Sequence, residues 1–124
     1  MNKENVNLWN RDFELLISYS CYPGEEITDI QKTAAIEFFA DPSIVMSTLD
    51  DLKIYIANNS DDNIKVDDIE NIFKYVMPKS IFIPRTEKKV VAIICNFKYD
   101  MENGIAVVFE EGKFKEIGPQ DIIL

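Results

Sequence analysis

Apolar residues recur along this chain with two different periods, and each period predicts one kind of secondary structure. From residue 13 to residue 22 every second residue is apolar, which predicts a strand with one buried face. Pro23 and Gly24 are expected to end this strand. The positions on its apolar face are Phe13, Leu15, Ile17, Tyr19 and Cys21.

Two helices are predicted to follow. Thr28 and Gln31 have the spacing of a capping box, so the first helix is expected to start there and to run to Ala40. Asp41 suits an N-cap and Pro42 the first helical position, which predicts the start of a second helix. Apolar residues of the second helix form one stripe with a 3.6-residue period. This stripe contains Val45, Leu49, Leu52 and Ile56.

A short third helix is predicted from about residue 67 to residue 77, with Pro78 at its end. The remainder of the chain alternates short apolar runs with turn residues, which is typical of strands. The strongest turn signal is Asn103-Gly104, a dipeptide that favours a hairpin. Strands are expected over residues 80–83, 89–98, 105–109 and 114–117.

One strand, about three helices and a final run of strands predict an α+β fold, with the helices packed on one face of a mostly antiparallel sheet. The first strand is expected to join that sheet, because it cannot bury its apolar face alone. The chain has the length of one domain and shows neither linker nor repeat. Residues 1–124 are therefore expected to form a single α+β domain.

The charge balance narrows the choice of partner. The chain carries 13 basic and 22 acidic side chains, a net charge of −9. Because binding to nucleic acid or anionic lipid relies on Lys and Arg, we expect no nucleic acid and no membrane as partner. The charge favours a basic protein partner, or serves solubility alone. No signal peptide is visible, which predicts a cytoplasmic location.

The sequence offers few groups for catalysis. Histidine is absent, which removes the commonest general base and a favoured zinc ligand. Cys21 and Cys95 lie in strand-like runs and are interpreted as buried, inert thiols. The acidic loop residues lack the alternate spacing and the glycine of a calcium loop. We therefore expect no catalytic residue, no metal site and no cofactor.

Acidic residues gather in one quarter of the chain. Residues 41–71 contain eight acidic and two basic side chains, a net charge of −6. We predict that this segment binds a basic partner, with a tyrosine beside its carboxylates. The alternative is a solvated helix surface with acidic caps. The predicted partner-binding residues are Asp50, Asp51, Tyr55, Asp61, Asp62, Asp67 and Asp68. Further aromatic candidates for exposure are Trp9, Tyr22, Tyr75 and Tyr99.

The C-terminal third carries a resemblance to a known family. A strand ends in an aspartate-x-glutamate-x-glycine turn within residues 95–109, and the chain closes on the glycine-x-glutamine-aspartate segment of residues 117–121. In these features residues 90–124 resemble small bacterial proteins of unknown function that include candidate immunity proteins of toxin systems. The resemblance implies a protein that binds and neutralises a cognate toxin, and it implies no catalytic residue.

The leading hypothesis is a non-enzymatic, immunity-type protein that neutralises a basic bacterial toxin. A second hypothesis is a small carboxylate-based enzyme or ligand-binding domain with a cleft between its helices and its sheet. A third is a homo-oligomeric structural protein that associates through an exposed strand edge. The sequence leaves the oligomeric state open.

Overall fold

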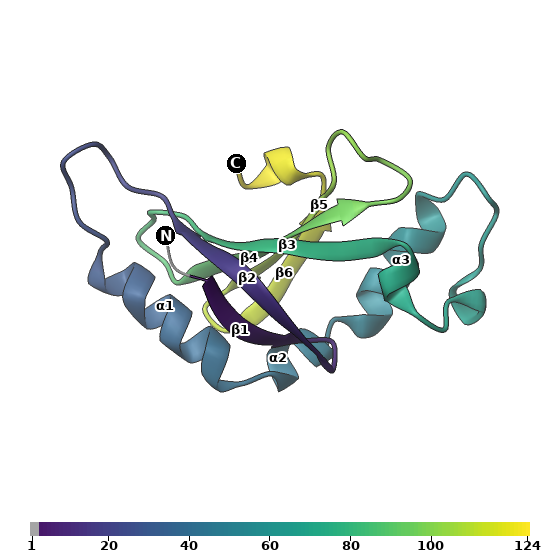
Figure 1. Ribbon diagram of the computed structural model, residues 1–124, viewed down its shortest axis with the longest axis horizontal. Coiled ribbons are helices and arrows are strands. Elements are labelled where there is room, and N and C mark those ends of the chain that lie inside the picture. The colour runs from purple at the N-terminus through teal and green to yellow at the C-terminus, as the bar shows by residue number, and fades with distance from the viewer. Residues whose placement is uncertain (1–2) are drawn as a thin grey trace.

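A computed structural model describes residues 3–124, and it confirms the α+β fold. Six strands form one sheet, and three α-helices lie along one side of it (Figure 1). The strands are β1 (Lys3–Leu8), β2 (Arg11–Tyr19), β3 (Val76–Ile83), β4 (Val90–Phe97), β5 (Ile105–Glu110) and β6 (Lys113–Gly118). The helices are α1 (Asp29–Ala40), α2 (Ser43–Met46) and α3 (Leu49–Asn58), with 3-10 turns η1 (Val66–Asp68), η2 (Ile72–Lys74) and η3 (Gln120–Ile122).

The strands lie in the sheet in the order in which they occur in the chain. Every neighbouring pair is antiparallel except β2 and β3, which run parallel with Leu16 opposite Ser80 and Tyr19 opposite Ile83. A parallel pair needs a long crossover. The segment between β2 and β3 contains all three α-helices, so this one crossover supplies the whole helical layer.

The main core lies between the helices and the sheet. Ala34 and Phe38 of α1 and Leu52 and Ile56 of α3 are buried there, together with alternate residues of the strands. The opposite face of the sheet holds a smaller apolar cluster, against which Ile123 of the C-terminal segment packs. The strand residues of this second cluster are Val90, Ala92, Ile94, Ala106 and Val108. Strands β4 and β5 are therefore apolar on both faces.

The capping box at the start of α1 is confirmed. The Gln31 amide donates to Thr28 Oγ1 at 3.1 Å, and the Gln31 side-chain oxygen Oε1 accepts from the Thr28 amide at 2.9 Å. Its Nε2 donates to the carbonyls of Ser20 and Ile83, at 2.8 and 3.1 Å. Gln31 thus joins α1 to the ends of β2 and β3. Ala34 and Phe38 of α1 are buried, whereas Ile36 is 69% exposed.

Two helix predictions are wrong in detail. The second helix is interrupted, because α2 ends at Met46 and α3 begins at Leu49. The third helix does not form: η1 and η2 occupy its first part, and Val76 and Pro78 are buried on β3. The apolar spacing in this segment fits the two 3-10 turns followed by an alternating strand. Pro78 accordingly lies inside a strand, next to an irregularity in the β3–β4 register.

The polar N-terminal stretch forms the unexpected strand β1, which pairs with β2 through a tight turn at Trp9 and Asn10. Both turn residues have positive φ, 50° and 67°. Such a conformation is costly for a residue as large as tryptophan. Trp9 is buried rather than exposed, and its Nε1 donates to Thr48 Oγ1 at 3.0 Å. Thr48 lies between α2 and α3, so this hydrogen bond holds the hairpin against the helix junction.

The residues of the C-terminal resemblance lie against one another. The Gln120 amide donates to the Asn103 carbonyl at 3.2 Å, and Gln120 Nε2 donates to the Cys95 carbonyl at 3.3 Å. Gly104 has a φ of 57°, and a Cβ placed on it would lie 2.5 Å from the Cys95 carbonyl oxygen. The glycine turn and the glutamine-aspartate ending therefore fasten the C-terminal segment to the β4–β5 turn.

The first prediction concerns the Trp9–Thr48 contact. Replacing Thr48 by Val keeps the shape of the buried side chain but leaves the indole N–H without an acceptor. We expect the free energy of unfolding, measured by urea denaturation, to fall by about 1–3 kcal/mol. Thr33 of α1 is exposed, and Thr33→Val serves as the control, with an expected change within about 0.5 kcal/mol. Equal effects of the two substitutions would contradict the role of the hydrogen bond.

Candidate partner-binding surface

The outer face of α3 is acidic at its start and apolar at its middle. Leu52 and Ile56 point into the core, whereas Asp50, Asp51 and Ile54 are exposed. Ile54 is 47% exposed and lies one helical turn after the two aspartates. The aspartates also lie at the positive end of the helix dipole, which favours their charge. This face therefore presents carboxylates beside an apolar side chain.

The structure divides the predicted site residues among three places. Asp50 and Asp51 begin α3, Asp61 and Asp62 lie in the loop after it, and Asp67 and Asp68 lie in η1. The ten residues of α3 span about 15 Å, so the first pair and the loop pair lie at opposite ends of this helix. All six aspartates are exposed. The segments that carry them, which are α3, the loop after it and η1, lie to the right in Figure 1, and the aspartates are spread along these segments rather than gathered in one compact cluster.

Several of these carboxylates make neither a hydrogen bond nor an ion pair with the part of the chain that the structure describes. In residues 3–124, neither a hydrogen bond nor an ion pair involves the side chains of Asp50, Asp51, Asp61 or Asp67. Asp68 has a structural role, because its Oδ2 accepts from the Lys65 amide at 3.2 Å. The four uncommitted carboxylates are therefore available to a cationic partner at little internal cost.

Asp62 is held by two side chains from the turn that follows β4. Tyr99 Oη donates to Asp62 Oδ2 at 2.7 Å, and Lys98 Nζ lies 4.0 Å from the same oxygen. The Lys98 ammonium also lies over the rings of Tyr99 and Tyr75, at 5.4 and 5.7 Å from their centroids. These two rings are stacked with centroids 6.1 Å apart. The acidic loop is thus attached to a tyrosine pair.

Tyr55 is a packed residue more than an exposed one. It is half-buried, and its ring centroid lies 5.8 Å from that of Phe97. Burial raises the pKa of Tyr55, and the negative charge of Asp100 raises it further. Burial is also the largest cause of a raised pKa at Tyr99, to which the hydrogen bond with Asp62 contributes. Both hydroxyls therefore remain protonated, and able to donate, at neutral pH.

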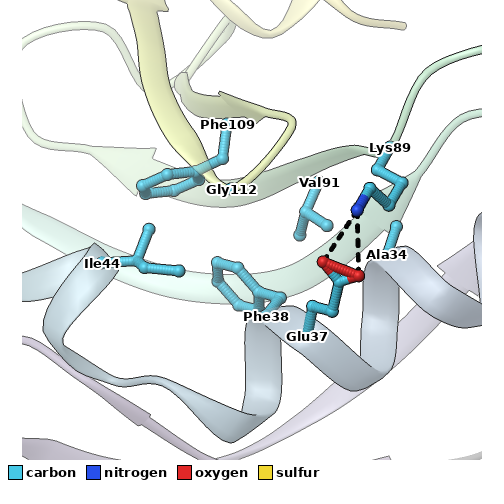
Figure 2. Close-up of a pocket in the computed structure, with 8 residues that line it drawn as sticks. All are labelled: Ala34, Glu37, Phe38, Ile44, Lys89, Val91, Phe109 and Gly112. Carbon is cyan, nitrogen blue, oxygen red and sulfur yellow. Dashed lines mark hydrogen bonds and ion pairs between the residues drawn. The ribbon is translucent and has the colours of Figure 1, made fainter.

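Wider hollows of about 380 and 230 Å³ lie between α1 and strands β1 and β2, but the space between the helices and strands β4 and β5 is too small for a substrate. A cavity of about 20 Å³ lies there among apolar side chains from α1, α2, β4 and β5 (Figure 2). That is room for about one water molecule. At its margin Lys89 Nζ lies 2.8 Å from Glu37 Oε1, and this hydrogen bond is the main cause of the raised pKa of Lys89. The cavity is lined by Ala34, Glu37, Phe38, Ile44, Lys89, Val91, Phe109 and Gly112.

Other groups considered for catalysis are dispersed. A shallow groove of about 450 Å³ on the opposite face of the sheet contains glutamates, but Glu110 there lies 3.9 Å from Lys88 Nζ and 3.7 Å from Lys115 Nζ. Within residues 3–124, no three acidic or cysteine side chains are placed to hold a metal ion. None of the described helices is long and apolar enough to cross a membrane.

The two thiols have different environments. Cys95 is buried, as predicted, and burial raises the pKa of its thiol. The prediction of a buried Cys21 is wrong, because β2 ends at Tyr19 and leaves Cys21 exposed in the following loop. The alternating pattern in the sequence thus extends beyond the residues that pair with β3.

Comparison with known proteins places this fold in a family. Residues 2–124 match a domain described as a domain of unknown function, DUF6985. The chain belongs to the DUF6985 family. Searches of curated proteins and of solved structures gave no match. The DUF6985 domain therefore spans both the acidic end and the C-terminal hairpin of this chain, and its description assigns no activity to either.

The attachment of the acidic loop leads to a second prediction. Tyr99→Phe removes the hydroxyl that donates to Asp62, so we expect the amides of residues 59–63 to exchange hydrogen about two- to tenfold faster. Hydrogen–deuterium exchange with mass spectrometry measures this change. Tyr22→Phe, at an exposed tyrosine in the loop before α1, is the control and should leave the same amides unchanged. Unaltered exchange in the Tyr99 variant would refute the attachment.

The third prediction concerns pH. Because the pKa of Tyr55 is raised in the folded protein, its neutral form stabilises the fold below about pH 10, and this contribution is lost as pH rises through the raised pKa. Asp100→Asn should lower the pKa of Tyr55 without restoring its ordinary value, since burial remains. Titration of the tyrosine ring carbons by NMR measures the shift. Glu102→Gln in the same turn is the control, and an equal shift there would count against Asp100.

Proposed function

We propose that this DUF6985 protein is a non-enzymatic binding protein of the immunity type, which neutralises a basic toxin through its acidic end. The observation that carries the proposal is the outer face of α3, where Asp50 and Asp51 adjoin the exposed Ile54. The loop after α3 extends this surface with Asp61 and Asp62. Cytoplasmic action and a bacterial toxin as target are parts of the same proposal.

The composition of this surface suits rapid and specific association. Carboxylates on one end of a protein steer a basic partner toward it and raise the association rate. An apolar side chain among them adds contact area once the partner has docked. The uncommitted carboxylates exchange water for a partner's Lys or Arg without breaking an internal ion pair. The attached loop loses less conformational freedom on binding than a free loop would.

The placement of the acidic side chains supports a binding role over a catalytic one. An enzyme of the carboxylate type needs paired acids that surround a bound substrate. Here the aspartates of α3 and of the loop after it face solvent, and Glu110 in the sheet groove lies close to two lysines. The surface is built for a large partner rather than for a small molecule.

The fourth prediction tests this function with a tagged protein in extracts of the source organism. We expect the wild type to retain a basic protein at about 50 mM salt and to release most of it at about 500 mM, because salt screens exposed charges. With the purified partner, Asp50→Asn, Asp51→Asn and Asp61→Asn combined should slow association about tenfold. Biolayer interferometry at both salt concentrations measures the rates.

The control removes the same number of charges elsewhere. Glu26, Glu87 and Glu116 are exposed and lie before α1, in the β3–β4 turn and on β6. Their triple replacement by Gln should change the association rate less than twofold. The proposal is overturned if no basic protein is retained, or if the two triple variants slow association equally. In the second case net charge, and not the end at α3, governs the encounter.

A further inference from the structure

We propose that Tyr75, Tyr99 and Asp62 form a receptor for an arginine side chain of a protein partner, and that Lys98 occupies this receptor in the free protein. The inference deepens the proposed function and rests on it only for the identity of the protein that supplies the arginine. The receptor is a separate feature from the outer face of α3. Three observations carry it: the cation already in place, the way the rings are fixed, and the groove beside them.

The first observation is the position of the Lys98 ammonium. It lies over two aromatic faces and 4.0 Å from the Asp62 carboxylate, which is the arrangement that proteins use to hold a cation. The side chains of Lys98 and Asp62 remain 55% and 57% exposed. An exposed ion pair of this length contributes little stability. Lys98 can therefore leave the rings at small cost, and water has access to all three groups.

The second observation is that the receptor is preorganised. The Lys98 amide donates to the Tyr75 carbonyl at 2.7 Å, which fixes the two tyrosine-bearing segments side by side. The Tyr99 ring packs edge-on against Phe97, whose side chain is buried, with centroids 5.7 Å apart. The Tyr99 hydroxyl in turn orients Asp62. The rings and the carboxylate are thus already in position, so binding restricts the conformational freedom of the incoming side chain alone.

The third observation is a groove of about 290 Å³ that adjoins Tyr75 and Lys98. Tyr75, Met77, Lys98 and Met101 are among its lining residues, and the two methionines are 41% and 69% exposed. Methionine side chains adapt to varied apolar shapes, and the methylene stem of arginine packs on such surfaces. Lys74 also lines the groove, and its positive charge opposes an incoming cation. Asp61 precedes Asp62 in the chain and Asp100 follows Tyr99, and the negative charges of these two residues favour the cation.

Arginine fits this receptor better than lysine does. A guanidinium is planar, so it stacks on a tyrosine face while its N–H groups reach a carboxylate in pairs. It is also less strongly hydrated than the ammonium that it displaces. An arginine from a basic partner would therefore replace Lys98 between Asp62 and the tyrosine pair. Arginine and tyrosine are also among the residues that most often dominate protein interfaces.

The fifth prediction tests the receptor without any partner protein. N-acetyl-arginine amide is titrated into isotope-labelled protein, and the NMR signals of Tyr75 and Tyr99 report binding. Lys98→Met removes the resident cation and should tighten binding of this probe about three- to fivefold, the equivalent of a weak surface ion pair. N-acetyl-citrulline amide has nearly the same shape without the charge and should shift these signals far less in both proteins.

Further variants separate binding at the receptor from a general effect of charge. Lys74→Met removes one positive charge from the same groove but leaves Lys98 in place, so it should change the affinity less than twofold. Lys98→Met combined with Tyr75→Leu should abolish the gain seen in Lys98→Met alone. Lys98→Gln, which keeps a polar side chain at the surface, should reproduce the gain if Lys98→Met folds poorly.

The proposal is overturned if arginine amide and citrulline amide shift the tyrosine signals equally, or if Lys74→Met tightens binding as much as Lys98→Met does. It is also overturned if loss of the Tyr75 ring leaves the affinity unchanged. A failure to capture a basic protein from extracts, together with selective binding of arginine amide, would reject the neutralising function and leave the receptor intact.

Discussion

Strands β2 and β3 lie side by side and run in the same direction, although all the residues from 20 to 75 separate them in the chain. This parallel pairing forces one long crossover over a single face of the sheet. The helices, the acidic loop and both 3-10 turns that follow it belong to that crossover. Gln31 ties its beginning to β2 and β3. The Trp9 indole ties the junction of α2 and α3 to the first hairpin.

The crossover also explains why α3 and the acidic loop after it are held firmly in place. α3 buries Leu52 and Ile56 against the sheet, so its outer face is presented at a fixed angle. The loop after α3 is then held by Tyr99, which lies in the turn after β4 and so outside the crossover. Two segments distant in sequence thus meet. The outer face of α3 combines uncommitted carboxylates with an exposed isoleucine, and the tyrosine pair is a second, separate feature of the kind proposed to bind a basic protein.

Local signals in the sequence were sufficient for much of the fold. The capping box at Thr28 and the apolar runs of β4 and β5 predict their elements because each depends on neighbouring residues alone. No local pattern in the sequence predicts strand β1, because the turn at Trp9 and Asn10 lacks a glycine. The conformation of this turn is stabilised by the distant Thr48. The strand character of Val76 likewise depends on pairing with β4.

The site was predictable in composition but not in arrangement. The charge of the sequence predicts the aspartates of α3 and its loop, and the helical period predicts the exposure of Asp50 and Asp51. The contact between Tyr75 and Tyr99 depends on the alignment of two chain segments, which no local pattern encodes. The tyrosines were recognisable as candidates for exposure, whereas their stacking under Lys98 required the tertiary structure.

The junction between Gly104 and Gln120 has a consequence for how sequences of this family can diverge. The glutamine contributes hydrogen bonds from a side chain and a backbone amide, so a different residue at this position would lose only the side-chain part. Gly104 faces the backbone carbonyl of Cys95, which no substitution at position 95 removes. The φ of Gly104 is also positive, which favours glycine. Evolution can thus alter position 120 gradually, but it can alter position 104 only by rebuilding the turn.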